Sequence, residues 1–175
     1  MMDNFPNLKK PSHLLATFFG VGLLPLAPGT WGSLAGLLLF FAFIFLQLSF
    51  STFLISLICI ILGSIFLCSQ ATKDLDEKDH KTIVIDEVAG VWTTFMFIPA
   101  LGIYNFSNQL WSENSYLAAI VLFLLFRVFD ILKPHPISFV DKRFKSGLGV
   151  VLDDLMAGVF AGLTLLGGNF FINIF

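Results

Sequence analysis

The run LAGLLLFFAFIFLQLSFSTFLISLICIILGSIFLC, residues 34–68, decides the fold class of this chain. It contains no Asp, Glu, Lys or Arg. The polar pair Ser51-Thr52 divides it into Leu34–Phe50 and Phe53–Cys68. A helix needs about 20 residues to cross a bilayer, or somewhat fewer where the bilayer thins locally. We therefore predict two transmembrane helices joined by a short turn, whose other ends emerge on the same side of the membrane.

The composition of the whole chain also indicates a membrane protein. Of its 175 residues, 57% are hydrophobic and 13% are charged, and the mean hydropathy is +0.88. A soluble domain of this size needs more polar surface than that. The formal net charge of -2 argues against a nucleic-acid partner. Both cysteines lie inside one apolar run, which favours neither a disulfide framework nor a Cys-X-X-Cys metal site.

Three further apolar runs complete the predicted topology. They cover Val88–Tyr104, Tyr116–Leu132 and Leu155–Ile174, which gives an all-α polytopic membrane protein with about five transmembrane helices. A shorter apolar stretch within residues 13–33 is broken by prolines and glycines, and we interpret it as a re-entrant or interfacial segment beside a polar site. The alternative is a sixth complete span. Because no linker or repeat marks a second domain, residues 1–175 are predicted to form a single membrane domain.

Basic residues are distributed asymmetrically over this topology. With five spans every Lys and Arg falls on one face, whereas the opposite loops Gln47–Thr52 and Asn105–Ser115 contain none. By the positive-inside rule the basic face is cytoplasmic. A sixth span would move two lysines to the other face and weaken the asymmetry without abolishing it. The basic residues are Lys9, Lys10, Lys73, Lys78, Lys81, Arg127, Lys133, Lys142, Arg143 and Lys145.

Two acidic pairs lie on this basic face at the starts of predicted spans. Asp86-Glu87 precedes the third span and Asp153-Asp154 precedes the fifth. We expect each pair in the first turn of its helix, where capping and the helix dipole explain an acid without any catalytic role. Asp130 adds a fifth carboxylate to the same face. Because clustered acids repel one another and any phosphate, we expect a divalent cation, and oxygen ligands with phosphate chemistry favour Mg2+. The predicted metal ligands are Asp86, Glu87, Asp130, Asp153 and Asp154, and the catalytic candidates are Asp86, Glu87, Asp130 and Asp154.

Candidate phosphate ligands accompany these acids. Arg127, Asp130 and Lys133 are spaced three apart at the end of the fourth predicted span and share one helix face. An intrahelical ion pair and the positive-inside rule explain them without function, while phosphate binding by the two cations is the alternative. Residues 28–33, Pro-Gly-Thr-Trp-Gly-Ser, lead into the first span, where N–H groups and hydroxyls could cradle a phosphate, although such sequences are also ordinary at helix starts. The predicted substrate ligands are Thr30, Gly32, Ser33, Arg127 and Lys133.

These residues together predict metal-assisted attack of water on a lipid phosphate, with any of the catalytic carboxylates as candidate general base. Two other functions fit parts of the pattern. A cation channel or transporter would place polar groups along the span interiors, yet the first two spans are nearly pure hydrocarbon. A lipid phosphotransferase of the CDP-alcohol type also uses aspartates and Mg2+, but its Asp-Gly-x-x-Ala-Arg motif does not occur in the sequence.

Four separated motifs resemble the phosphatidylglycerophosphatase A family. They are LAPGTWGS at residues 26–33, VIDEVAG at residues 84–90, FRVFDILKP at residues 126–134, and GLGVVLDD at residues 147–154, and they stand in the family's order over nearly the whole chain. The resemblance implies a Mg2+-dependent lipid phosphatase that hydrolyses phosphatidylglycerophosphate to phosphatidylglycerol and inorganic phosphate. It also implies a multi-pass protein of the bacterial inner membrane, with its active site on the cytoplasmic face.

Overall fold

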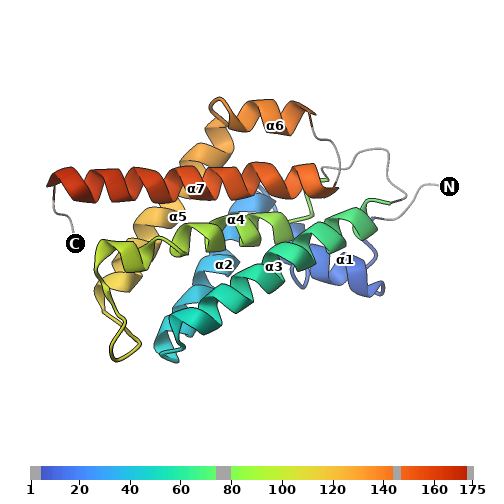
Figure 1. The fold of residues 1–175 in the computed structure, drawn as a ribbon. Coiled ribbons are helices and arrows are strands. Elements are labelled where there is room, and N and C mark those ends of the chain that lie inside the picture. The colour runs from blue at the N-terminus through green and yellow to red at the C-terminus, as the bar shows by residue number, and fades with distance from the viewer. Residues whose placement is uncertain (1–4, 74–79, 144–146, 173–175) are drawn as a thin grey trace.

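Helices make up nearly all of the regular structure in this computed structural model, which describes residues 5–73, 80–143 and 147–172, the side chains of residues 141, 142 and 172 excepted (Figure 1). A two-stranded antiparallel hairpin separates η2 from α5. In chain order the elements are α1 (Pro11–Ala16), the 3-10 helix η1 (Val21–Leu23), α2 (Pro28–Phe45), α3 (Phe50–Ala71), α4 (Ile85–Phe95), the 3-10 helix η2 (Ile98–Leu101), β1 (Tyr104–Asn105), β2 (Leu110–Trp111), α5 (Asn114–Leu132), α6 (Ile137–Arg143) and α7 (Gly147–Ile172).

Four helices of the described chain are long and apolar enough to cross a membrane, namely α2, α3, α5 and α7. This confirms the predicted all-α membrane fold, but it does not confirm the count of five spans. The third predicted span, Val88–Tyr104, corresponds to the 11-residue α4 followed by η2 and β1. Such a helix is about 16 Å long, roughly half the thickness of the hydrocarbon core. Pro99 and the left-handed Gly102 then turn the chain away from a continuing helix.

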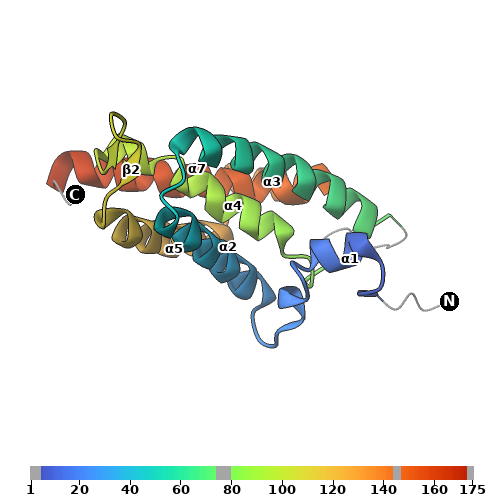
Figure 2. The ribbon, with the colours of Figure 1, turned by 90° about the horizontal axis from the view of Figure 1, so that it is seen from below.

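Helix α4 owes its apolar sequence to its place inside the bundle. Apart from Glu87, all of its residues are buried, and α2, α3, α5 and α7 pack against it (Figure 2). Trp92 donates from Nε1 to the carbonyl oxygen of Gly36 in α2, at 2.9 Å. The hydroxyl of Ser64 in α3 lies 3.0 Å from the carbonyl oxygen of Ile85. Neighbouring helices therefore hold α4 at both its first turn and its middle.

The α2–α3 turn and the hairpin close one end of the molecule (Figure 1). Trp111 donates from Nε1 to the carbonyl oxygen of Leu48 at 2.7 Å, and the N–H of Phe50 donates to the Tyr104 hydroxyl at 3.0 Å. Stacked rings continue inward from there, with the centroids of Phe40 and Phe95 4.2 Å apart. This end carries the two loops in which the sequence has no Lys or Arg.

The other end gathers α1, the C-terminus of α3 and the starts of α4 and α7 (Figure 1). Helix α1 has six residues, too few to cross a bilayer, so the alternative of a sixth span is excluded. The interpretation of residues 13–33 as re-entrant or interfacial stays a prediction. Lys78, Lys145 and the side chain of Lys142, which entered the sidedness argument, lie outside the part of the chain that the structure describes.

Candidate active site

Three acids from two helices form a compact cluster, which we call the acid triad: Asp86, Glu87 and Asp154. Asp86 and Glu87 lie in the first turn of α4, as predicted, and Asp154 belongs to α7. One carboxylate oxygen from each residue lies within 4.8 Å of the other two. Asp86 is 4% exposed and Asp154 is 5% exposed, so both carboxylates are shielded from bulk water. Such a group of oxygen atoms could share one hard cation.

Two glycines allow α7 to approach α4 closely enough to form the triad. A Cβ placed on Gly90 would lie 2.9 Å from the Cβ of Asp154 and 2.7 Å from the ring of Phe126. A Cβ placed on Gly158 would lie 2.5 Å from the carbonyl oxygen of Gly90. Since a real Cβ does not fit at these separations, any larger residue would push the two helices apart. Gly90 belongs to the VIDEVAG motif and Gly158 follows the GLGVVLDD motif by four residues, but nothing in the sequence pattern shows that they face each other.

The position of the second acidic pair in its helix differs from the prediction. We expected Asp153 and Asp154 in the first turn, but α7 begins at Gly147 and reaches them only after nearly two turns. The first residue of α7 packs closely on α3, since a Cβ on Gly147 would lie 2.6 Å from the backbone nitrogen of Ser69. The helix dipole acts within the first turn alone. Capping therefore does not explain these two acids, and another positive charge must compensate them.

Two basic residues at the end of α5 neutralise the acids outside the triad. Arg127 Nη1 donates to Asp130 Oδ2 at 2.6 Å, and Lys133 Nζ donates to Asp153 Oδ2 at 2.5 Å. Lys133 caps α5 in the left-handed region, with φ 40. A non-glycine residue in that region is strained, and such strain is concentrated at functional sites. Asp130 and Asp153 thus lie beside cations, and their predicted role as metal ligands stays a prediction.

The triad itself has the properties of a cation site. Oxygen Oε2 of Glu87 is buried, and the described residues offer it no hydrogen-bond partner. Burial raises the pKa of Glu87 well above its ordinary value, and the carboxylates of Asp86, Asp154 and Asp130 raise it further. A buried, unpaired carboxylate oxygen is destabilising unless a charge meets it. The donor set therefore fits a divalent cation, which would supply both a charge and a ligand partner.

The first turn of α2 lies against this cluster. We expected residues 28–33 as a turn before the helix, but α2 already begins at Pro28, the position where a missing N–H is tolerated. The fully buried Ser33 donates its hydroxyl hydrogen to the Gly29 carbonyl at 2.8 Å and accepts from Arg127 Nη1 at 3.1 Å. A Cβ on Gly29 would lie 3.3 Å from Glu87 Cδ. Ser33 is thus placed to hold Arg127.

Gly32 and Thr30, the other two predicted ligands of this turn, differ in their exposure to solvent. Gly32 is buried, and a Cβ there would lie 2.6 Å from the Cβ of Val84, so it serves the packing of α2 on the segment before α4. Thr30 is partly exposed on the same turn. Their binding of substrate stays a prediction.

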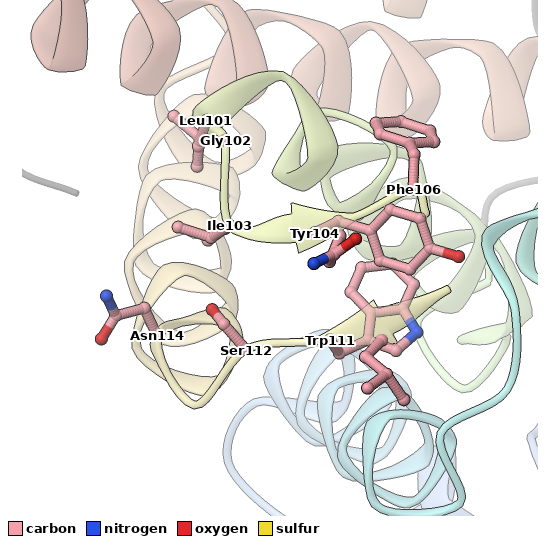
Figure 3. A pocket seen from close by; sticks show the side chains of 10 residues that line it. Leu101, Gly102, Ile103, Tyr104, Phe106, Trp111, Ser112 and Asn114 are labelled. Carbon is pink, nitrogen blue, oxygen red and sulfur yellow. The ribbon is translucent and has the colours of Figure 1, made fainter. Parts of the chain in front are cut away.

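A pocket of about 740 Å³ lies away from the triad, at the β1–β2 hairpin (Figure 3). Tyr104, Phe106 and Trp111 contribute rings to its wall, and Ser112 and Asn114 contribute polar groups. Its lining contains no Asp, Glu, His, Lys or Arg. The pocket therefore lacks the groups that phosphate hydrolysis requires.

Comparison with known proteins places this arrangement in a family. Residues 14–169 match the family model described as phosphatidylglycerophosphatase A. The chain is 42% identical over 166 residues to phosphatidylglycerophosphatase A of Haemophilus influenzae, covering 92% of this chain and 93% of that protein. It is 36% identical over 164 residues to phosphatidylglycerophosphatase A of Escherichia coli, covering 93% and 86%. It is 34% identical over 160 residues, covering 88% and 92%, to a Bacteroides thetaiotaomicron protein provisionally named as a phosphatidylinositol-3-phosphatase. No solved structure matches the chain. The chain belongs to the phosphatidylglycerophosphatase A family.

Proposed function

We propose that the protein hydrolyses the terminal phosphomonoester of phosphatidylglycerophosphate, giving phosphatidylglycerol and inorganic phosphate. Two relatives that carry the name of this activity, at 42% and 36% identity over most of the chain, support the substrate. The observation that carries the chemistry is the acid triad, whose carboxylate oxygens lie within 4.8 Å of one another. Beside it lie Arg127 and Lys133, each of which forms an ion pair with an aspartate.

The triad is the proposed metal site. Asp86, Glu87 and Asp154 would hold the ion, and Mg2+ suits hard oxygen donors and a phosphate substrate. When bound, the ion neutralises the phosphomonoester and makes a water molecule more acidic. Asp130 and Asp153, also predicted as ligands, have Arg127 and Lys133 as immediate partners. We therefore assign these two acids the task of orienting the cations that bind phosphate oxygens.

The chain's own residues account for the handling of substrate and protons. Arg127 is fixed by Asp130 and Ser33, so its guanidinium is held ready for phosphate oxygens. The side chain of Lys133 is 28% exposed and can contact a phosphate from the solvent side. Water attacks phosphorus and forms a new P–O bond as the bond to the glycerol oxygen breaks. A carboxylate of the cluster accepts the proton of the water, and the departing glycerol oxygen is protonated from solvent.

We also infer that the site faces the cytoplasm from the inner membrane of a bacterium. The end of the bundle that holds the triad carries the described lysines and arginines, whereas the α2–α3 turn and the hairpin carry none. The positive-inside rule assigns the basic end to the cytoplasm. A lipid in the inner leaflet could then present its headgroup to the triad while its acyl chains remain in the bilayer.

Phosphate release from defined lipids in detergent micelles tests the proposal. Purified protein should release phosphate from phosphatidylglycerophosphate in the presence of Mg2+, and a chelator should abolish the release. Phosphatidylinositol-3-phosphate serves as the competing substrate, because one relative carries that name. Release from the inositol lipid alone would contradict the proposed substrate. Ion flux through liposomes without any phosphate release would instead support the channel alternative.

A further inference from the structure

The segment between α1 and α2, residues 18–26, exposes large apolar side chains close to the triad. Phe19 is 67% exposed, Leu23 45%, Leu24 43% and Leu26 101%. So many large apolar groups in so short a segment form a patch that is unfavourable in water. The segment does not belong to any of the four helices that could span a membrane. Its exposure therefore needs an explanation other than a bilayer crossing.

The backbone of this segment is suited to apolar surroundings. In an ordinary loop many backbone N–H groups would be exposed to solvent. Here all seven N–H groups from Phe18 to Leu24 donate to partners within residues 14–21. Pro25 has no N–H to satisfy. Phe18, Phe19 and Leu26 have left-handed φ values of 46, 57 and 78. Because unsatisfied backbone groups are strongly unfavourable in hydrocarbon, this internally bonded and strained path fits the apolar boundary of a membrane.

The segment is connected to the candidate active site at both of its ends. The N–H of Val84, just before the acidic pair of α4, donates to the carbonyl of Ala16 at 3.0 Å. Trp31 donates from Nε1 to the carbonyl of Pro25 at 3.2 Å. Leu26 stands three residues before Gly29, which packs on Glu87. Three Cα–Cα links of about 3.8 Å place Leu26 within roughly 11 Å of that contact.

We infer that residues 18–26 form the surface on which the acyl chains of the substrate lipid lie while its headgroup reaches the triad, an inference that rests on the proposed function. The occupant is a diacyl lipid because the patch continues, through the exposed Trp31, into the exposed Leu38 and Leu39 of the spanning helix α2. Exposed Lys9 and Lys10 precede the patch, and they favour an anionic headgroup at this edge.

Membrane depth at Leu26 tests the inference without any assay of activity. A spin label at Leu26→Cys, in a chain carrying Cys59→Ser and Cys68→Ala, should be accessible to oxygen and protected from a water-soluble nickel complex in liposomes. The matched label at Lys10→Cys should show the reverse. Equal accessibility of both labels to nickel would overturn the inference, whatever the lipid substrate proves to be.

Kinetics on two substrates then test the contact with acyl chains. Leu26→Ser should lower kcat/KM for long-chain phosphatidylglycerophosphate about tenfold, because the variant loses the contact of one leucine with hydrocarbon. The kcat/KM for a water-soluble glycerophosphate analogue should stay within about twofold of the wild-type value. Leu110→Ser, at a leucine of 46% exposure on the hairpin, is the control that should change neither. Equal losses on both substrates, or no loss on either, would overturn the inference. A wild-type protein inactive on both substrates would instead refute the proposed function, with the spin-label result still standing.

Discussion

The five acids of the site differ in what lies beside each carboxylate. Asp130 and Asp153 have a basic nitrogen at 2.6 and 2.5 Å, whereas the triad residues lie against one another. The sequence placed all five acids on one face, because alternating spans bring the ends of odd and even helices together. Spacing within one helix allowed the Arg127–Asp130 ion pair, but the sequence could not show that Lys133 pairs with Asp153. That pairing depends on the left-handed turn of Lys133 and on the rotation of α7, which no local pattern specifies.

Removal of the Lys133 ammonium should leave the Asp153 carboxylate without its ion-pair partner and destabilise the fold. Lys133→Met should lower the free energy of unfolding by roughly 1–3 kcal/mol, less than for a fully buried pair because the lysine is 28% exposed. Asp153→Asn in the same chain should recover much of that loss. Unfolding of both single variants and the double variant in detergent gives the coupling energy. Additive losses would show that the two residues do not stabilise each other.

Ser33 should act through Arg127 and not through direct contact with substrate. Ser33→Ala removes one hydrogen bond to a charged partner, so kcat/KM for phosphate release should fall about fivefold to tenfold. The same substitution in an Arg127→Lys background should cause little further loss, because the interaction is already absent. Steady-state kinetics of the four proteins decide the matter. A full loss in both backgrounds would return Ser33 to the predicted role of phosphate ligand.

The partly buried Glu87 should make the metal-free protein less stable as pH rises. Its pKa lies well above the ordinary value because of burial and the adjacent carboxylates. Between about pH 4.3 and that raised pKa, the folded state binds more protons than the unfolded state, so stability decreases as pH increases. Thermal unfolding in a chelator measures this slope. Glu87→Gln should flatten it, and an unchanged slope in that variant would contradict the assignment.

Among the elements, the long helices were predicted from the sequence better than their boundaries were. The sequence also did not show that α4 is a short helix surrounded by other helices. Uniform apolar runs predict α2, α3, α5 and α7 because length and hydropathy suffice for a span. The run from Val88 to Tyr104 looks the same, although α4 is apolar because other helices surround it. Both α2 and α7 start earlier than predicted. Pro28 suits the first position of α2, whereas the low helix propensity of Gly147 at the start of α7 is overridden by tertiary packing.

The crossing of α4 and α7 should be far less tolerant of a methyl group than the lipid-facing side of α3. Gly90→Ala should lower both thermal stability and phosphate release, because its Cβ would displace Phe126 or Asp154. Gly63→Ala is the matched control within another helix, since nothing lies within 4 Å of its Cβ position. That variant should be neutral or more stable by up to about 1 kcal/mol. Comparable damage from both substitutions would contradict the close approach.

At the scale of the whole molecule, the two ends of the bundle differ in chemistry. The hairpin end is aromatic and lacks lysine and arginine in its loops, while the other end holds the triad, the cations and the apolar segment of residues 18–26. The two ends located from the apolar runs do not depend on whether α4 is a span, because α4 starts at the basic end and leads the chain to the hairpin end. The predicted sidedness therefore does not depend on the number of spans.

We propose that Asp86, Glu87 and Asp154 form the metal site of a lipid phosphatase. The most direct measurement is Mg2+-dependent phosphate release from phosphatidylglycerophosphate by Asp86→Asn, Glu87→Gln and Asp154→Asn, with Glu113→Gln, an acid near the hairpin, as the control. Each triad variant should keep a cooperative thermal transition and lose on the order of 10² to 10³ in kcat. The control should keep near-normal turnover. Near-normal turnover in Asp86→Asn and Asp154→Asn would show that the triad is not the metal site.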